Sequence, residues 1–169
     1  MGVRRDAVRP PSAWADAWAL TKPGITALVV VTAAVGAWMA GPPAWGLWGW
    51  ASCLGGTALL AGGTNALNQY AERREDGRMR RTRGRPLPSG RMRPGAALGF
   101  AVAISVAGAA WLALAANLWA AALGAFALAS YVFVYTPLKR RAWWCTLVGA
   151  VPGAVPPLLG WAAVRGGLD

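Results

Sequence analysis

The chain has 169 residues, of which 56% are hydrophobic, and it contains 11 tryptophans and no histidine. Its net charge of +11 would suit a nucleic-acid-binding protein, but the charges are confined to a few blocks between long uncharged stretches. Because this pattern leaves no soluble fold to carry a basic patch, it argues against nucleic acid as a partner and indicates a membrane protein in contact with the lipid bilayer.

Residues 1–22 are expected to form a cytoplasmic segment ahead of a membrane domain made of residues 23–169. The first uncharged stretch of that domain is long enough for two membrane crossings of about 20 residues each. A Gly-Pro-Pro run at 41–43 interrupts it, and glycine and proline together are typical of a turn. The pattern therefore predicts helices near 24–40 and 45–70.

Oxygen-bearing side chains gather where the second predicted helix ends. Asn68, Glu72 and Asp76 are spaced i, i+4, i+8, so they form one stripe if the helix continues. The chain has no histidine and neither cysteine is close to the stripe, so zinc, copper and iron lack their preferred ligands. Carboxylates with an amide suit magnesium instead.

Four arginines follow within ten residues and suit forked hydrogen bonding to phosphate oxygens; they are Arg80, Arg81, Arg83 and Arg85. Metal ligands and arginines together predict a magnesium-diphosphate site in a cytoplasmic motif loop of residues 72–94. The alternative is ordinary pairing of charges on a helix surface, which is worth only a few tenths of a kcal/mol. That alternative leaves unexplained why Asn65 and Asn68 lie at membrane depth, where polar groups tend to face a cavity or a partner.

Two further uncharged stretches follow the motif loop. The first is interrupted only by Asn117 and predicts helices near 95–115 and 118–136, and the second predicts a helix near 143–164. The expected fold is therefore an all-α, multi-pass transmembrane bundle of about five spans. Prolines at 152, 156 and 157 free backbone carbonyls in the last helix, so that helix is expected to face a cavity.

The basic residues alternate with the predicted spans. The blocks 4–22, 72–93 and 139–141 hold 16 of the 17 Lys and Arg residues, whereas Arg165 alone falls on the other side. By the positive-inside rule, the N-terminus and the motif loop are expected to be cytoplasmic.

Tyr135 and Lys139 end the fourth predicted helix on the same face as the motif loop. Neither residue needs a catalytic role to be explained, because tyrosine commonly anchors a helix at the membrane interface and a basic residue commonly sets the topology. Their location also allows a phenol and an ammonium to reach a phosphate. The two cysteines, Cys53 and Cys145, lie within predicted spans and are expected to be buried.

These residues resemble the UbiA-type intramembrane prenyltransferases, and specifically the protohaem IX farnesyltransferases or haem O synthases. The first acidic motif of that family, N-x-x-x-D/E-x-x-x-D, is matched by Asn68, Glu72 and Asp76. Its continuation, M-x-R-T-x-x-R-P-L, is matched at residues 79–87. The likeness starts near position 18 and includes the segments 21–23, 135–140, 146–150 and 152–154.

The resemblance implies a helical bundle around a cavity in which magnesium and acidic motifs hold farnesyl diphosphate. Ionisation would give an allylic cation, which a vinyl group of protohaem IX (haem B, a substrate) attacks before water completes the product, haem O. It also implies a bacterial inner-membrane location. The implied magnesium-diphosphate ligands are Asn68, Glu72 and Asp76, and these three together with Tyr135 and Lys139 are the implied catalytic residues. The implied diphosphate contacts are Arg81, Arg85 and Lys139, and Tyr135 would lie beside the allylic carbon, where an aromatic wall suits a cation.

The chain departs from the family pattern at several points. Gly24 stands where the family usually has arginine, and the family has nine helices with a second Asp-rich motif in its later half. The chain is therefore expected to be an N-terminal portion, inactive alone, with the later helices or haem A pathway proteins as partners. Two alternatives stay open: a prenyltransferase for a quinone or chlorophyll precursor, and a membrane protein without catalytic activity.

Overall fold

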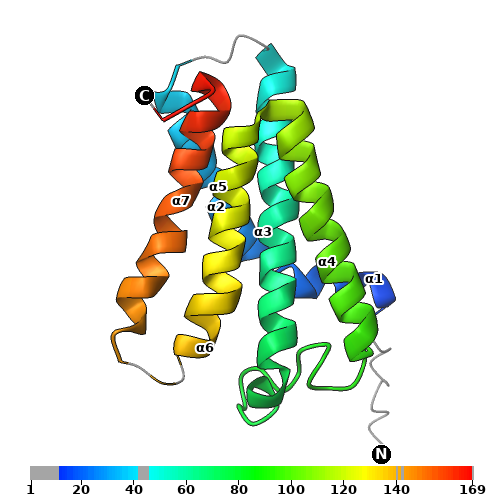
Figure 1. Cartoon of the computed structure of the whole chain (residues 1–169). Helices are drawn as coiled ribbons and strands as arrows, with labels where there is room; N and C mark the ends of the chain where they lie inside the picture. Colours follow the sequence, from blue (N-terminus) through cyan, green and yellow to red (C-terminus); the bar gives the residue numbers. More distant parts are fainter. Residues whose placement is uncertain (1–11, 42–45, 140, 142, 169) are drawn as a thin grey trace, which may run out of the picture.

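The computed structural model describes residues 12–41, 46–139, 141 and 143–168. Within those residues the chain is helical and contains no strand, which confirms the all-α prediction. Figure 1 shows long helices running side by side, with a short N-terminal helix lying across the lower end of the bundle. Residues 42 and 43 of the predicted break and residues 1–11 of the N-terminal segment lie outside the described residues.

Five long helical stretches form the bundle. They are α2 (Pro23–Met39), α3 (Gly46–Asp76), α4 (Pro94–Trp111) with a π-helical end η1 (Leu112–Ala116), α5 (Leu118–Ala129) with the π-helical segment η2 (Ser130–Tyr135) and α6 (Thr136–Leu138), and α7 (Cys145–Arg165). All five predicted helices are present. Apart from the end of the second one, every predicted bound lies within two residues of the observed bound.

The N-terminal segment contains a helix that the sequence did not reveal. Helix α1 spans Ala13–Leu20, and the side chain of Ser12 caps it by accepting a hydrogen bond from the Ala15 N–H at 3.3 Å. It meets α2 at an angle of 46°. Trp14 and Trp18 are exposed on α1, as expected for tryptophans at a membrane interface.

Helix α3 runs to Asp76, six residues beyond its predicted end. Glu72 and Asp76, predicted to begin the motif loop, therefore lie on the helix itself. Both side chains are buried, and each is paired with a cation from another segment. That pairing explains why the helix continues past the apolar run. The loop proper begins at Gly77 and ends where α4 starts.

Within the part of the chain that the structure describes, fewer stretches than the five expected spans are long and apolar enough to cross a bilayer by themselves. Among the described residues, three stretches are long and apolar enough to cross a bilayer, namely 94–116, 118–138 and 145–165, and the bent pair α1–α2 makes a possible fourth. Helix α3 fails this test because glycine, threonine and asparagine dilute its apolar residues. It lies at the centre of the bundle, in contact with α2, α4, α5 and α7, so its neighbours are mostly protein rather than lipid.

Two apolar clusters hold the bundle together. One joins α3 to η1, α5 and α7 and includes Cys53, Leu60 and Leu159. The second joins α1, α3, α4 and the motif loop through Leu20, Ala66, Leu87, Ala97 and Ala101, and so fixes the loop against the helices. Cys53 is buried as predicted, whereas the prediction for Cys145 was wrong because this residue begins α7 and is only partly covered.

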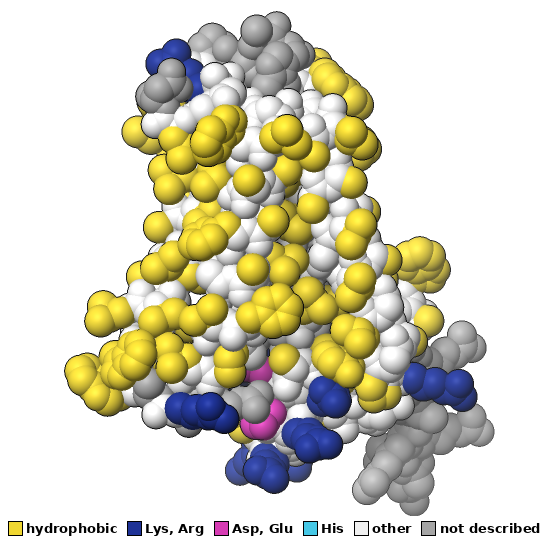
Figure 2. All heavy atoms as spheres, in the orientation of Figure 1, with side chains coloured by type: hydrophobic (Ala, Val, Ile, Leu, Met, Phe, Trp, Pro, Cys, Tyr) yellow, Lys and Arg dark blue, Asp and Glu magenta, His cyan; other side chains and the backbone are white. Residues whose placement is uncertain are grey.

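Charged side chains gather at one end of the molecule. Figure 2 shows Lys and Arg around the lower end of the bundle, below a broad band of hydrophobic side chains. This end contains α1, the motif loop and the connection from α6 to α7. The three basic blocks of the sequence thus share one end, insofar as their residues are described.

Helices α2 and α7 approach each other through two glycines. A Cβ atom on Gly36 would overlap the Pro157 backbone, and one on Gly160 would overlap the Ala33 carbonyl. Small residues allow such close contact between helices in lipid, where packing rather than the hydrophobic effect drives association. The contact closes one side of the bundle.

We expect Gly160→Ala to lower the free energy of unfolding by about 1–3 kcal/mol, because the added methyl must push two backbones apart. Unfolding of the purified protein in mixed micelles with increasing denaturing detergent measures this loss. Gly153→Ala on the same helix is the control, since its Cβ would meet nothing within 4 Å. Equal effects of the two substitutions would contradict the packing described.

Candidate functional site

Polar side chains cover the buried face of α3 over its last three turns. Asn65, Asn68, Gln69, Glu72 and Asp76 are each at most 6% exposed. Spacings of three and four residues place them along one side of the helix. Buried polar groups require partners, and these residues find theirs on segments that are distant in the sequence.

Asn68 links three segments of the chain. Its Oδ1 accepts a hydrogen bond from the Lys22 ammonium at 2.7 Å, and its amide donates to the Thr136 hydroxyl at 3.2 Å. Lys22 precedes the first spanning helix and adopts left-handed backbone angles, φ 48° and ψ 67°. Burial, followed by the charge of Arg85, lowers the pKa of Lys22 to about 8.

Glu72 forms an ion pair with Lys139, the residue that follows α6. The Lys139 ammonium also lies 6.0 Å from the ring centroid of Tyr135, and Tyr135 packs on Tyr131 with ring centroids 5.2 Å apart. The structure therefore brings Tyr135 and Lys139, predicted from a separate part of the sequence, to the acidic stripe.

Asp76 is held by the motif loop. Its Oδ2 accepts a hydrogen bond from the Arg85 guanidinium at 2.7 Å, and the Thr82 hydroxyl donates to its backbone carbonyl at 2.9 Å. These contacts fold the loop back onto the end of α3. Arg81, the other arginine predicted to bind diphosphate, is exposed, and its side chain makes no hydrogen bond or ion pair within the described part of the chain.

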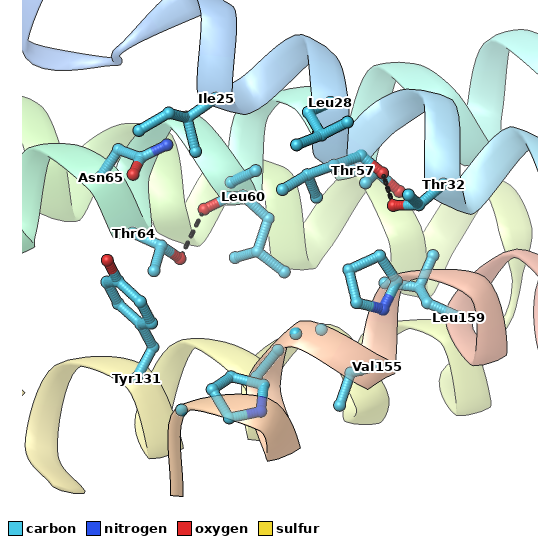
Figure 3. Close-up of a pocket in the computed structure, with 18 residues that line it drawn as sticks. Ile25, Leu28, Thr32, Thr57, Leu60, Thr64, Asn65, Tyr131, Val155 and Leu159 are labelled. Carbon is cyan, nitrogen blue, oxygen red and sulfur yellow. Dashed lines mark hydrogen bonds between the residues drawn. The ribbon is translucent and has the colours of Figure 1, made fainter. Parts of the chain in front are cut away.

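A cavity of about 290 Å³ lies between α2, α3, α5, η2 and α7 (Figure 3). Its walls are mostly apolar, with Ile25, Leu28, Leu60 and Leu159 among them. Pro152 and Pro156 also line it, which confirms that the proline-containing helix faces a cavity. Pro157 turns instead toward Gly36 of α2.

The cavity leads to the polar stripe along α3. Asn65 lines the cavity and donates a hydrogen bond to the Thr26 hydroxyl at 3.1 Å, and Asn68 lies one turn further on. Figure 3 shows the ring of Tyr131 extending into the same space, whereas Tyr135 is not among the lining residues. The arrangement suits an elongated ligand with an apolar tail and an anionic head.

The oxygen donors of the stripe are of the chemical kind that magnesium prefers. Within the described residues no group of three or more His, Cys, Asp or Glu side chains forms a metal cluster. Magnesium does not require one, because it commonly binds through one or two carboxylates together with substrate phosphates. Glu72 and Asp76 supply two carboxylates and Asn68 an amide oxygen, each now paired with a cation of the chain.

Comparison with known proteins identifies the family. Residues 29–169 match the UbiA prenyltransferase family. The chain belongs to this family. It is therefore a multi-pass membrane protein, in agreement with its apolar helices.

Curated relatives of this UbiA chain are protoheme IX farnesyltransferases. The protein of Solibacter usitatus is 51% identical, covering 88% of the chain and 54% of the relative. The Myxococcus xanthus protein is 50% identical, and the match covers 94% of the chain and 54% of the relative. The Anaeromyxobacter dehalogenans protein is 47% identical, and the match covers 98% of the chain and 56% of the relative. The chain spans about half the length of these relatives. No solved structure matches it significantly.

Four residues of the site were missed in the sequence. Lys22, Gln69, Tyr131 and Thr136 lie beside the predicted ones but were not singled out. Tyr131 had a signal, because it lies four residues before Tyr135 at helical spacing. Lys22 had a weaker one, in the Thr-Lys-Pro segment of the family resemblance. Thr136 had a similar one, in the segment 135–140 of the resemblance, whereas for Gln69 the sequence does not show which segment it contacts.

We expect Asp76 and Arg85 to be energetically coupled in the absence of ligand. Asp76→Asn or Arg85→Gln should each destabilise the chain, and the double variant should lose less than the sum, with a coupling of about 0.5–2 kcal/mol. Unfolding in denaturing detergent of the unaltered chain, the two single variants and the double variant gives the double-mutant cycle from which this coupling is calculated. Purely additive losses would show that the ion pair contributes nothing in solution.

Proposed function

We propose that the chain binds farnesyl diphosphate and forms the diphosphate-binding part of a protohaem IX farnesyltransferase. The observation that carries this proposal is an apolar cavity leading along α3 to a buried stripe of Asn68, Glu72 and Asp76. The farnesyl chain fits the cavity by its chemistry, and the diphosphate fits the polar end. The names of the relatives support the choice of substrates.

The chain offers three cations for the diphosphate. Lys22, Arg85 and Lys139 now pair with Asn68, Asp76 and Glu72, and they approach from three different segments. When diphosphate enters, these cations turn to its oxygens and release the oxygen ligands of the stripe. Magnesium held there by Asn68, Glu72 and Asp76 would neutralise the leaving group. Arg81, predicted as a further contact, would have to move in from the exposed loop.

The proposed reaction transfers the farnesyl group to haem B. The bond between the allylic carbon and the diphosphate oxygen breaks, and its electron pair leaves with the diphosphate. A vinyl carbon of haem B forms the new bond, and water adds to the resulting cation and loses a proton, which gives haem O. The aromatic pair of Tyr131 and Tyr135 offers π-faces close to the positive charge.

The whole reaction is proposed for the complete protein rather than for this chain alone. The later helices that the resemblance implies, with a second acidic motif, would come from the remainder of the protein or from a partner subunit. We also propose the bacterial inner membrane as the location. The cytoplasm would be on the side of α1 and the motif loop, in keeping with their basic residues.

Binding of farnesyl diphosphate to the chain in lipid nanodiscs tests the site. We expect Arg85→Gln to weaken magnesium-dependent binding about tenfold or more, because it removes the charge-assisted contact that this guanidinium is proposed to make with the diphosphate. Arg78→Gln is the matched control: it is an exposed arginine of the same loop, and it should leave binding near that of the unaltered chain. Adding a chelator should abolish binding in both. Equal losses in the two variants would show that only the net charge of the loop matters.

The acceptor is tested in a complete protein that contains this chain. Farnesyl diphosphate is supplied with haem B or with a hydroxybenzoate, and the products are identified by mass. We expect haem O, and Asp76→Asn should abolish its formation while membrane insertion stays normal. A prenylated hydroxybenzoate would favour a quinone-type enzyme. Full activity of Asp76→Asn would favour the alternative of a protein without this catalytic site.

A further inference from the structure

We propose that Gln69 is a positioning residue, which holds the turn between α1 and α2 so that the Lys22 ammonium stays at the diphosphate site. The inference rests on the proposed function for its consequence, since the position of Lys22 affects ligand binding only if an anionic ligand binds beside Asn68. Gln69 itself is not expected to touch the substrate.

The contacts of Gln69 join the site helix to the end of α1. Its side-chain amide donates to the carbonyls of Ala19 and Leu20, at 2.9 and 3.0 Å. These carbonyls belong to the last two residues of α1, directly before Thr21 and Lys22. Gln69 therefore fixes the backbone two residues ahead of the lysine whose ammonium reaches Asn68.

The same side chain is costly as a purely structural element. Gln69 is 2% exposed, and its Oε1 has no hydrogen-bond partner among the described residues. A buried acceptor without a partner is unfavourable, so an apolar side chain of similar size would serve packing at least as well. The two bonds of its amide group give the residue its specific effect on the turn.

Lys22 needs such support because its backbone is strained. Its φ of 48° is the only positive value of a non-glycine residue in the described part of the chain. Residues other than glycine adopt left-handed backbone angles at a cost of about 1–2 kcal/mol, and they keep these angles only where the surrounding structure enforces them. The lysine side chain is also long and flexible, so its head stays in place only if the backbone from which it extends is fixed.

A second clamp acts on α1 from the motif loop. The carboxylate of Asp16 is buried and accepts hydrogen bonds from Arg91, with Nε at 3.0 Å from Oδ1 and Nη2 at 2.9 Å from the same oxygen. Arg91 also donates to the Gly84 carbonyl at 3.1 Å. Helix α1 is thus attached to both α3 and the loop that carries Arg85. These contacts fix the turn at Lys22 and the loop at Arg85 in position relative to each other.

The first test requires no ligand. Gln69→Met keeps the length of the side chain and removes both donors. In hydrogen exchange of the chain in nanodiscs, we expect amides of residues 19–26 to exchange about tenfold faster, a factor that matches the loss of one or two hydrogen bonds. Amides of α4 are the internal control and should not change. Unchanged exchange at the turn would overturn the proposal. If Gln69→Met fails to fold, Gln69→Leu also removes both donors without adding a charge.

The second test asks whether Gln69 acts through Lys22. Binding of farnesyl diphosphate with magnesium is measured for Gln69→Met, Lys22→Met and the double variant. We expect each single substitution to weaken binding about tenfold, and the double variant to be no weaker than Lys22→Met alone. Multiplied losses, or unaltered binding in Gln69→Met, would overturn the positioning role. If the unaltered chain binds no farnesyl diphosphate, the proposed function fails, and the exchange measurement still decides the role of Gln69.

Discussion

The pairing of buried oxygens on α3 with cations from other segments determines much of this structure. Asn68, Glu72 and Asp76 would be costly at the edge of a bilayer without partners, and Lys22, Lys139 and Arg85 supply them. The three pairs draw together the α1–α2 turn, the end of α6 and the motif loop. A ligand that competes for these cations therefore acts on three segments at once, and this places the candidate site where the fold is most interconnected.

The central place of α3 follows from the same constraint. A helix that carries several amides and carboxylates must be surrounded by protein, so its other positions are small enough for α2, α4, α5 and α7 to approach. Those small residues also leave the cavity that ends at Asn65. The polar end and the apolar wall of the site are thus consequences of one helix sequence.

Much of this arrangement could be predicted. Uncharged stretches and their breaks located all five long helices, and the spacing of Asn68, Glu72 and Asp76 placed them on one face. The predictions failed where contacts decide the outcome. Helix α3 extends to Asp76 because distant cations pair with its last turns. Helix α1 is short, so its formation depends more on capping by Ser12 and on the hydrogen bonds from Gln69 than on its composition. Tyr131 enters the cavity through the packing of η2, which periodicity alone does not specify.

The composition of α3 also affects how the protein enters the membrane. A segment of 31 residues with many glycines and buried amides gains little from lipid by itself, whereas the segments 94–116 and 118–138 are apolar enough to partition on their own. Insertion of α3 is therefore favoured only once α2 or α4 is present to cover its polar face. The helix that carries the candidate chemistry depends on its neighbours during biosynthesis, before any substrate is bound.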